Sequence, residues 1–270
     1  MGNELKTTKG KFVKGDNFLI KQKITTPCEH KTDGETDGAV KIAGYMVKEI
    51  QQNSQSGTAR EIKYYNDWLQ QVEDWQKLPW YVRLGSNAPE PTTMEALTKW
   101  ALMVQTGGKW DHKLIIREKF RLYGVHRPLA SGTHSKSWYH KYEKHDYYLD
   151  VWSNIHYGYL GLVCGFDEAT LLKGAGLMQQ IDRSRDGKDT LRQGASKIYR
   201  RKWETLDNPA DQLTIKIGFM LFKKYGVKNV RKLTASDLLN ALENIPKGEL
   251  KDSRVIHVCY DSSQKKFTQD

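Results

Sequence analysis

The sequence predicts a mainly α fold: one helical domain of seven to eight helices, with a few short strands near the termini. Three observations support this prediction. Apolar residues recur at steps of three to four in most long segments, which is the period of an amphipathic helix. Capping residues and glycine or proline stops bound those segments. A length of 270 residues with 38% hydrophobic content is sufficient for one core, and no internal repeat is visible.

Three segments of the N-terminal half have helical periodicity. They are Ala39–Gln52, Arg60–Leu78, which stops at Pro79, and Thr93–Thr106, which Thr93 caps. The second carries a stripe of tyrosine and tryptophan side chains. Such a stripe is typical of a core, and stacking on sugars or bases is the alternative. Residues 1–38 are expected to be an extension or delivery segment, and residues 39–270 the helical domain.

The second half adds four expected helices. Two span Val151–Gly165 and Glu168–Ile181, with Asp167 as the N-cap of the second. A third begins at the Asp-Asn-Pro sequence of residues 207–209 and ends at Gly226, and Thr234 caps the last. Between these groups, residues 121–145 are expected to form a long solvated loop. Residues 254–260 are expected to form a strand, or a tail that pairs with the N-terminal strand.

The charge of the chain favours a polyanionic partner. The formal net charge is +11 and the isoelectric point is near 9.3, which suits nucleic acid, anionic lipid or a cell-wall polymer. Arg183–Glu204 is the best local candidate for phosphate contacts, although a solvated charged segment would look the same. No stretch approaches 18 apolar residues, and the N-terminus has no secretory h-region. We therefore expect synthesis in the cytoplasm and export by another machine.

Reactive side chains gather in and around the apolar stretch Asp146–Gln180. Asp150 and Asn154 are four residues apart and so share a helix face, and His156 follows. A histidine with a carboxylate partner can transfer protons near neutral pH. The simpler interpretation is that Asp150 caps a helix and His156 is a core histidine.

Two further sets are candidates for chemistry. Asp111, His112 and Lys113 follow a Gly-Gly break, and Asp207 and Asp211 flank the start of a helix, where capping is the commoner role. Six of the eight histidines lie between residues 112 and 156, but none has zinc-site spacing. We therefore expect no metal or other cofactor to be required, with a divalent ion as the alternative.

Four ordered segments resemble the bacterial polymorphic toxin type 44 family. They are GGKWDHK, SNIHYGYLGLVCGF, LLKGAGLMQ and DNPADQLTIKIGFMLFKKYG, which together span Gly107–Gly226. The resemblance implies an interbacterial toxin that a secretion machine, for example of type VI, delivers and that a cognate immunity protein neutralises. It also implies a ribonuclease activity. Its polar positions fall on Asp111, Asn154, His156, Tyr157, Gln179, Asp207 and Asp211. The basic segment 183–204 is an insertion relative to that pattern.

Two enzymatic functions and one other remain open at this stage. The first, which the net charge and the resemblance favour, is a nuclease that uses His/Asp acid–base chemistry. The second is a hydrolase of peptidoglycan or its lipid precursor, because the aromatic content, the paired carboxylates and the GLMQ sequence at residues 176–179 fit it. That sequence is similar to lytic transglycosylases, but their catalytic Glu is missing. The third is a non-enzymatic basic binding module.

The predicted site combines these residues. We expect His156 to be the general acid or base, oriented by Asp150 or by a carboxylate from the segment Asp207–Asp211. The expected catalytic residues are His156, Asp150, Asp211 and Asp111. The expected substrate-binding residues are Asn154, Tyr157, Gln179, Lys113 and Asp207.

Overall fold

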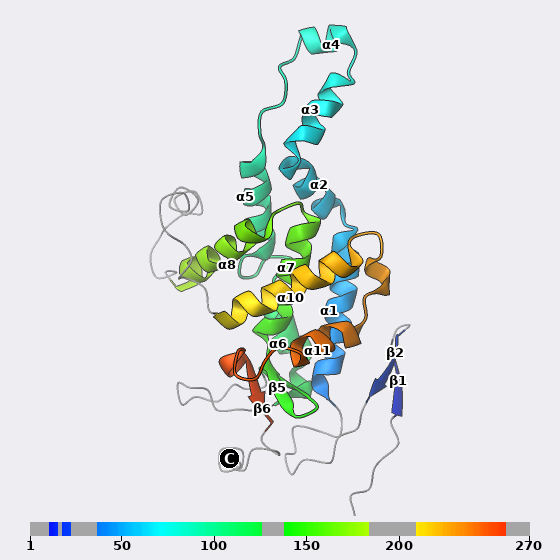
Figure 1. The fold of residues 1–270 in the computed structure, drawn as a ribbon, viewed down its shortest axis with the longest axis vertical. Helices are drawn as coiled ribbons and strands as arrows, with labels where there is room; N and C mark the ends of the chain where they lie inside the picture. The colour runs from blue at the N-terminus through cyan, green and yellow to red at the C-terminus, as the bar shows by residue number, and fades with distance from the viewer. Residues whose placement is uncertain (1–10, 16–17, 23–36, 126–137, 184–208, 258–270) are drawn as a thin grey trace, which may run out of the picture.

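The structure, a computed structural model, describes residues 11–15, 18–22, 37–125, 138–183 and 209–257, with side chains for 37–125, 138–175 and 209–257 (Figure 1). The described part is mainly helical, which confirms the predicted fold class. Its ten α-helices are α1 (Gly38–Ser54), α2 (Gly57–Asn66), α3 (Trp68–Gln76), α4 (Trp80–Leu84), α5 (Thr93–Val104), α6 (Lys113–Lys119), α7 (Asp150–Val163), α8 (Glu168–Arg183), α10 (Pro209–Tyr225) and α11 (Ala235–Glu243).

Two small antiparallel sheets accompany the helices. The strands β1 (Lys11–Gly15) and β2 (Phe18–Gln22) pair with each other. The second sheet has the order β3 (Gly124–Val125), β4 (Tyr139–Tyr142), β5 (His145–Tyr148) and β6 (Arg254–Ile256). Because β6 pairs with β5, the alternative that the C-terminal strand joins the N-terminal one is wrong.

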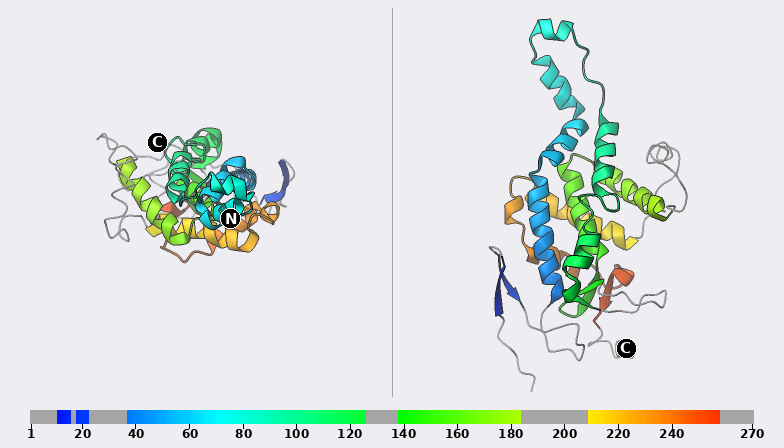
Figure 2. Two further views of the ribbon diagram at one scale, coloured as in Figure 1. Left: turned by 90° about the horizontal axis from the view of Figure 1, so that it is seen from above. Right: turned by 180° about the vertical axis from the view of Figure 1, so that it is seen from behind.

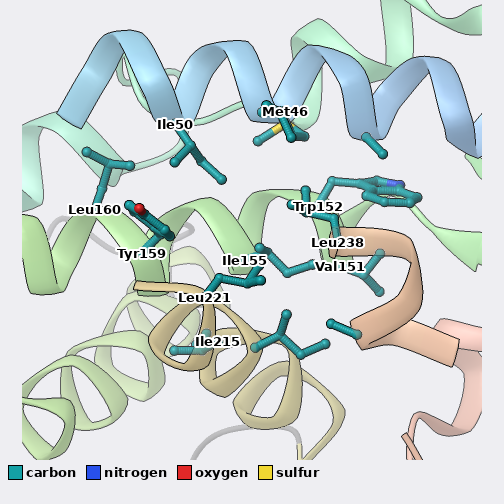
Figure 3. Packing of buried hydrophobic residues seen from close by; sticks show 14 of the residues in the cluster. Met46, Ile50, Val151, Trp152, Ile155, Tyr159, Leu160, Ile215, Leu221 and Leu238 are labelled. Atoms are coloured by element: carbon teal, nitrogen blue, oxygen red, sulfur yellow. The ribbon is translucent and has the colours of Figure 1, made fainter. Parts of the chain in front are cut away.

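Helix α7 is the centre of the hydrophobic core. Figure 3 shows α1 on one side of it, with α10 and α11 on the other. The labelled core side chains are Met46, Ile50, Val151, Trp152, Ile155, Tyr159, Leu160, Ile215, Leu221 and Leu238, all buried. Burying one such large apolar side chain stabilises a fold by about 1.5–3 kcal/mol. This packing fixes the first two turns of α7, where Asp150 and Asn154 lie.

Two glycines allow α7 and α10 to cross in close contact. A Cβ at Gly158 would lie 2.2 Å from the carbonyl oxygen of Ile215, and a Cβ at Gly218 would lie 2.3 Å from that of Ile155. Both obstacles are backbone atoms, so neither can move without shifting a helix. The glycines in this apolar stretch therefore serve close packing.

We expect Gly158→Ala and Gly218→Ala each to lower the free energy of unfolding by at least about 1–3 kcal/mol, the usual cost of overpacking. Chemical denaturation measures it. Gly57→Ala is the matched control, because a Cβ there meets nothing within 4 Å. It should be neutral or slightly stabilising, since alanine favours a helix by up to about 1 kcal/mol over glycine. Equal stability of all three variants would contradict the close-packing role.

The expected helix Arg60–Leu78 is divided at Asp67. The Asp67 carboxylate accepts a hydrogen bond from the Gln70 amide and so begins α3 as a separate helix. Helices α2, α3 and α4 and the return to α5 form an arm along the longest axis of the molecule (Figures 1 and 2). Thr93 is the first residue of α5, not its cap, and Thr92 instead bonds the Tyr65 carbonyl.

The expectation of a solvated loop over residues 121–145 is wrong for its C-terminal part. Strand β4 places His140 and Lys141 in the interior. The Lys141 ammonium pairs with the buried Asp37 carboxylate, which also accepts a hydrogen bond from the Glu143 amide. Buried charges need such partners. Residues 126–137 lie outside the described part. No helix among the described residues is long and apolar enough to cross a membrane.

Candidate active site

A cluster of polar side chains forms where α6, α7 and α10 begin. Lys113 is the first residue of α6, Asp150 is the first of α7, and Asp211 lies in the first turn of α10. The Lys113 ammonium nitrogen lies 3.5 Å from Asp150 Oδ1. The Asn154 amide donates to Asp211 Oδ1 over 2.9 Å. With Asp111, these residues make up the carboxylate cluster.

The charges in the carboxylate cluster act on one another. Burial raises the pKa of Asp150, the Lys113 charge and hydrogen bond pull it down, and the net direction is upward. Burial lowers the pKa of Lys113, but the charges of Asp150 and Asp211, in that order, outweigh it and raise the pKa. Lys113 is therefore a cation shared by both carboxylates. Asp150 is a carboxyl group that stays protonated at a higher pH than usual, as a general acid requires.

Asp111 holds the cluster in place. Its carboxylate accepts hydrogen bonds from the Gly107 amide at 3.0 Å and the Lys113 amide at 3.2 Å. Gly107 has a φ of +78°, a conformation that glycine adopts without strain. Asp111 is buried and thus ties the Gly-Gly turn to the first turn of α6. This geometry makes it a positioning residue for Lys113.

The described contacts of His156 are with residues outside the carboxylate cluster. It is buried, its Nε2 atom lies 3.1 Å from the Asn53 amide nitrogen, and its ring meets the His112 ring with centroids 4.3 Å apart. His112 Nδ1 in turn lies 3.0 Å from the Tyr45 hydroxyl. The expectation that a carboxylate orients His156 is wrong for the described residues, because α1 supplies its polar partner.

Burial makes this histidine pair hard to protonate. Burial, and then the charge of His112, lowers the pKa of His156 well below its usual value. Burial lowers the pKa of His112 to about 4, against a smaller opposing effect of Asp111. Both rings are therefore neutral at pH 7. The pair acts as a core contact between α1, α6 and α7.

Residues 99–224 match the family model described as bacterial toxin 44. This segment is similar to the bacterial toxin 44 family, and we call residues 99–224 the toxin domain. It runs from within α5 to the end of α10 and contains the whole carboxylate cluster, as the four motif segments predict. The arm helices α2 to α4 and the histidine partner Asn53 lie outside it. No curated protein and no solved structure matches the chain.

The other predicted substrate-binding residues of the toxin domain divide into two groups. Tyr157 lies away from the carboxylate cluster: its hydroxyl donates to the Leu171 carbonyl over 3.0 Å and so joins α7 to α8. Gln179 lies on α8, but its side chain is not among those described. Asp207 lies outside the described residues. The binding roles of these three residues stay predictions.

Two residues near the carboxylate cluster were not expected. Thr214 contacts the Asn154 amide at 3.1 Å and is buried one turn after Asp211. Tyr148 is half-buried, and burial followed by the charge of Asp150 raises its pKa. Tyr148 lies two residues before Asp150, and Thr214 three after Asp211. Sequence proximity alone could have pointed to them, but nothing in their pattern distinguishes them from core residues.

No group of three or more His, Cys, Asp or Glu residues is arranged to hold a metal ion within the part of the toxin domain that the structure describes. Assays with and without a chelator, described below, test whether the activity needs a divalent ion.

Proposed function

We propose that the toxin domain is a hydrolase that works through the carboxylate cluster, with Asp150 as general acid and Asp211 as the base or nucleophile. The observation that carries this proposal is the pairing of two carboxyl groups around one lysine, with an upward shift in the pKa of Asp150. A carboxyl group with a raised pKa can donate a proton while a second carboxyl group acts as base or nucleophile. Asn154 keeps Asp211 oriented through its 2.9 Å hydrogen bond.

The substrate that suits this pair best is a glycan of the bacterial cell envelope. Cleavage of a glycosidic bond needs a protonated carboxyl group at the leaving oxygen and an ionised carboxylate that activates water or attacks the sugar carbon. It needs no histidine. In this mechanism Asp150 protonates the leaving oxygen, while Asp211 activates water or attacks the sugar carbon. The exposed aromatic rings of the arm, such as Trp68 and Tyr64, are of the kind that stacks on sugars.

Nucleic acid is the second candidate substrate, and the charge of the chain favours it. The net charge is +11, and the basic segment 183–204 precedes the start of α10, which carries Asp211. Basic side chains can hold the phosphates. In this variant Asp211 takes the 2′-hydroxyl proton, the 2′-oxygen attacks phosphorus, and Asp150 protonates the 5′-oxygen that leaves, while Lys113 stabilises charge on the phosphate. The two candidates share the same residues and differ in the compartment where the toxin acts.

The family also suggests the setting. We propose that the chain is delivered into a target bacterium by a secretion system and that a cognate immunity protein protects the producer. The side chains of Lys113 and Asp150 are 44% and 28% exposed, so an immunity protein that covers them would block the cluster. Co-expression with the neighbouring open reading frame, followed by a growth assay, tests this part.

The test is compartment-directed expression in a bacterium, with and without a periplasmic signal. We expect the periplasmic form to cause swelling and lysis and the purified chain to release soluble fragments from peptidoglycan sacculi. Killing only from the cytoplasm, with degraded RNA or DNA, would mean that the substrate is nucleic acid and not a glycan. Asp252→Asn is the control for substitutions in the carboxylate cluster, such as Asp150→Asn. The Asp252 carboxylate is exposed and remote in sequence from the cluster, so this variant should kill like the wild type. Assays with and without a chelator test metal dependence.

A further inference from the structure

The end of the arm presents a patch of large apolar side chains. Helix α4 is the sequence Trp-Tyr-Val-Arg-Leu, and none of its residues is buried. Leu84 is 78% exposed, Trp80 67% and Tyr81 65%, and Leu78 and Val82 are also exposed. We call these five residues the arm tip. Exposed clusters of this kind on a folded protein mark contact surfaces.

The arm tip is held in a fixed shape. The Trp75 indole donates to the Ser86 hydroxyl over 3.0 Å, and that hydroxyl donates to the Val82 carbonyl. The Arg83 guanidinium lies 5.8 Å from the centre of the Trp75 ring. Nearer the body, the Trp68 indole donates to the Pro89 carbonyl and so joins the two sides of the arm. The apolar surface is therefore preformed.

The composition of the arm tip suits the boundary between lipid headgroups and acyl chains. Tryptophan and tyrosine favour that boundary, and leucine and valine favour the acyl region. Between residues 75 and 89 the only charged residues are Lys77 and Arg83, both basic; Lys77 pairs with Asp74 over 3.1 Å, which leaves Arg83 as the cation within α4. Basic side chains beside an inserted apolar surface are attracted to anionic lipids.

The position of the arm tip favours a membrane over a protein as its partner. Helix α4 lies at the far end of the molecule's longest axis (Figures 1 and 2), where a flat surface can meet it without contact with the body. A stable protein interface takes about 20–30 residues from each partner, and a five-residue helix with its flanks is too small for a second copy. A few aromatic and aliphatic side chains are enough for reversible attachment to a bilayer.

We propose that the arm tip inserts into the surface of an anionic phospholipid membrane and holds the chain there. The side chains of Trp80, Tyr81 and Leu84 enter the headgroup boundary, while Arg83 contacts lipid phosphates. This inference does not depend on the substrate of the carboxylate cluster.

The experiment uses the full chain with vesicles of phosphatidylethanolamine and phosphatidylglycerol. We expect cosedimentation with these vesicles, and we expect Trp80→Ser combined with Leu84→Ser to lower the partition coefficient about tenfold or more. High salt removes attraction that is due only to the +11 charge. The lower partition coefficient of the double variant, relative to the wild type, should therefore persist at high salt. The control is Leu122→Ser, since Leu122 is 89% exposed but lies outside the arm; its binding should match the wild type.

A second measurement reports insertion directly. Lipids with brominated acyl chains quench tryptophans that enter the bilayer. Trp80→Phe should reduce this quenching while retaining most of the binding. The proposal is overturned if the wild type does not bind, if the double variant binds as tightly as the wild type, or if the double variant changes only a concentration-dependent self-association seen in sedimentation.

Discussion

Asp150→Asn is expected to abolish killing and to lower the hydrolytic rate by about 10²–10⁴-fold, the usual contribution of a general acid. The amide keeps the shape of the side chain and its contact with Lys113 but has no proton of suitable acidity to give. Asp211→Asn should lose a similar factor, because an amide cannot act as a base or nucleophile. Fragment release from sacculi measures both rates, and ribonuclease digestion does so for the second candidate substrate.

Lys113→Gln provides a pH readout for the same site. The Lys113 charge pulls the pKa of Asp150 down against the effect of burial. Its removal should therefore raise the pKa of Asp150 and shift the alkaline limb of the activity profile to higher pH. An unchanged profile would mean that Asp150 is not the group whose protonation limits the rate.

His156→Gln separates chemistry from folding. We expect this variant to be less stable, but the fraction that remains folded should still kill. The reason is that His156 contacts Asn53 and His112 and no carboxylate among the described residues. If His156→Gln retained wild-type stability and lost all activity, the original assignment of His156 as the acid–base residue would be restored.

Acidification from pH 7 to pH 5 is expected to remove several kcal/mol of stability. Burial lowers the pKa of His112 to about 4 and that of His140 to about 3. The unfolded chain binds protons to these histidines below pH about 6.5, whereas the folded chain does not, so stability falls as the pH drops through that value. Each histidine contributes a loss of about 2 kcal/mol between pH 7 and pH 5, from 1.36 kcal/mol per pH unit.

Denaturant titrations at several pH values measure this loss. His140→Leu is the informative variant, because neither ring nitrogen of His140 has a hydrogen-bond partner in the described part of the chain. Between pH 6.5 and pH 4, it should reduce the slope of the free energy of unfolding against pH by the amount that corresponds to one proton. A slope equal to that of the wild type would show that His140 accepts its proton in the folded state.

Local signals in the sequence predicted much of the helical framework. Asp167 caps α8 through the Thr170 amide at 2.8 Å, and Thr234 and Asp237 form a complete capping box at α11. These contacts join residues three apart, so the residue types specify them. The division at Asp67 was missed because the aromatic stripe runs through it with helical spacing.

The sequence by itself determined the fold class, the bounds of α7 to within two residues and the resemblance to the toxin family. Of the carboxylate cluster, the family motif indicated Asp111, Asn154 and Asp211, and the local grouping of reactive side chains indicated Lys113 and Asp150. Only the tertiary structure decided which reactive groups meet. Asn53, 103 residues away, takes the partner position on His156 that a nearby carboxylate was expected to fill, whereas Lys113 and Asp150 meet because the ends of α6 and α7 converge. Spacing along a helix fixes a shared face, but burial and long-range packing decide which face touches which partner.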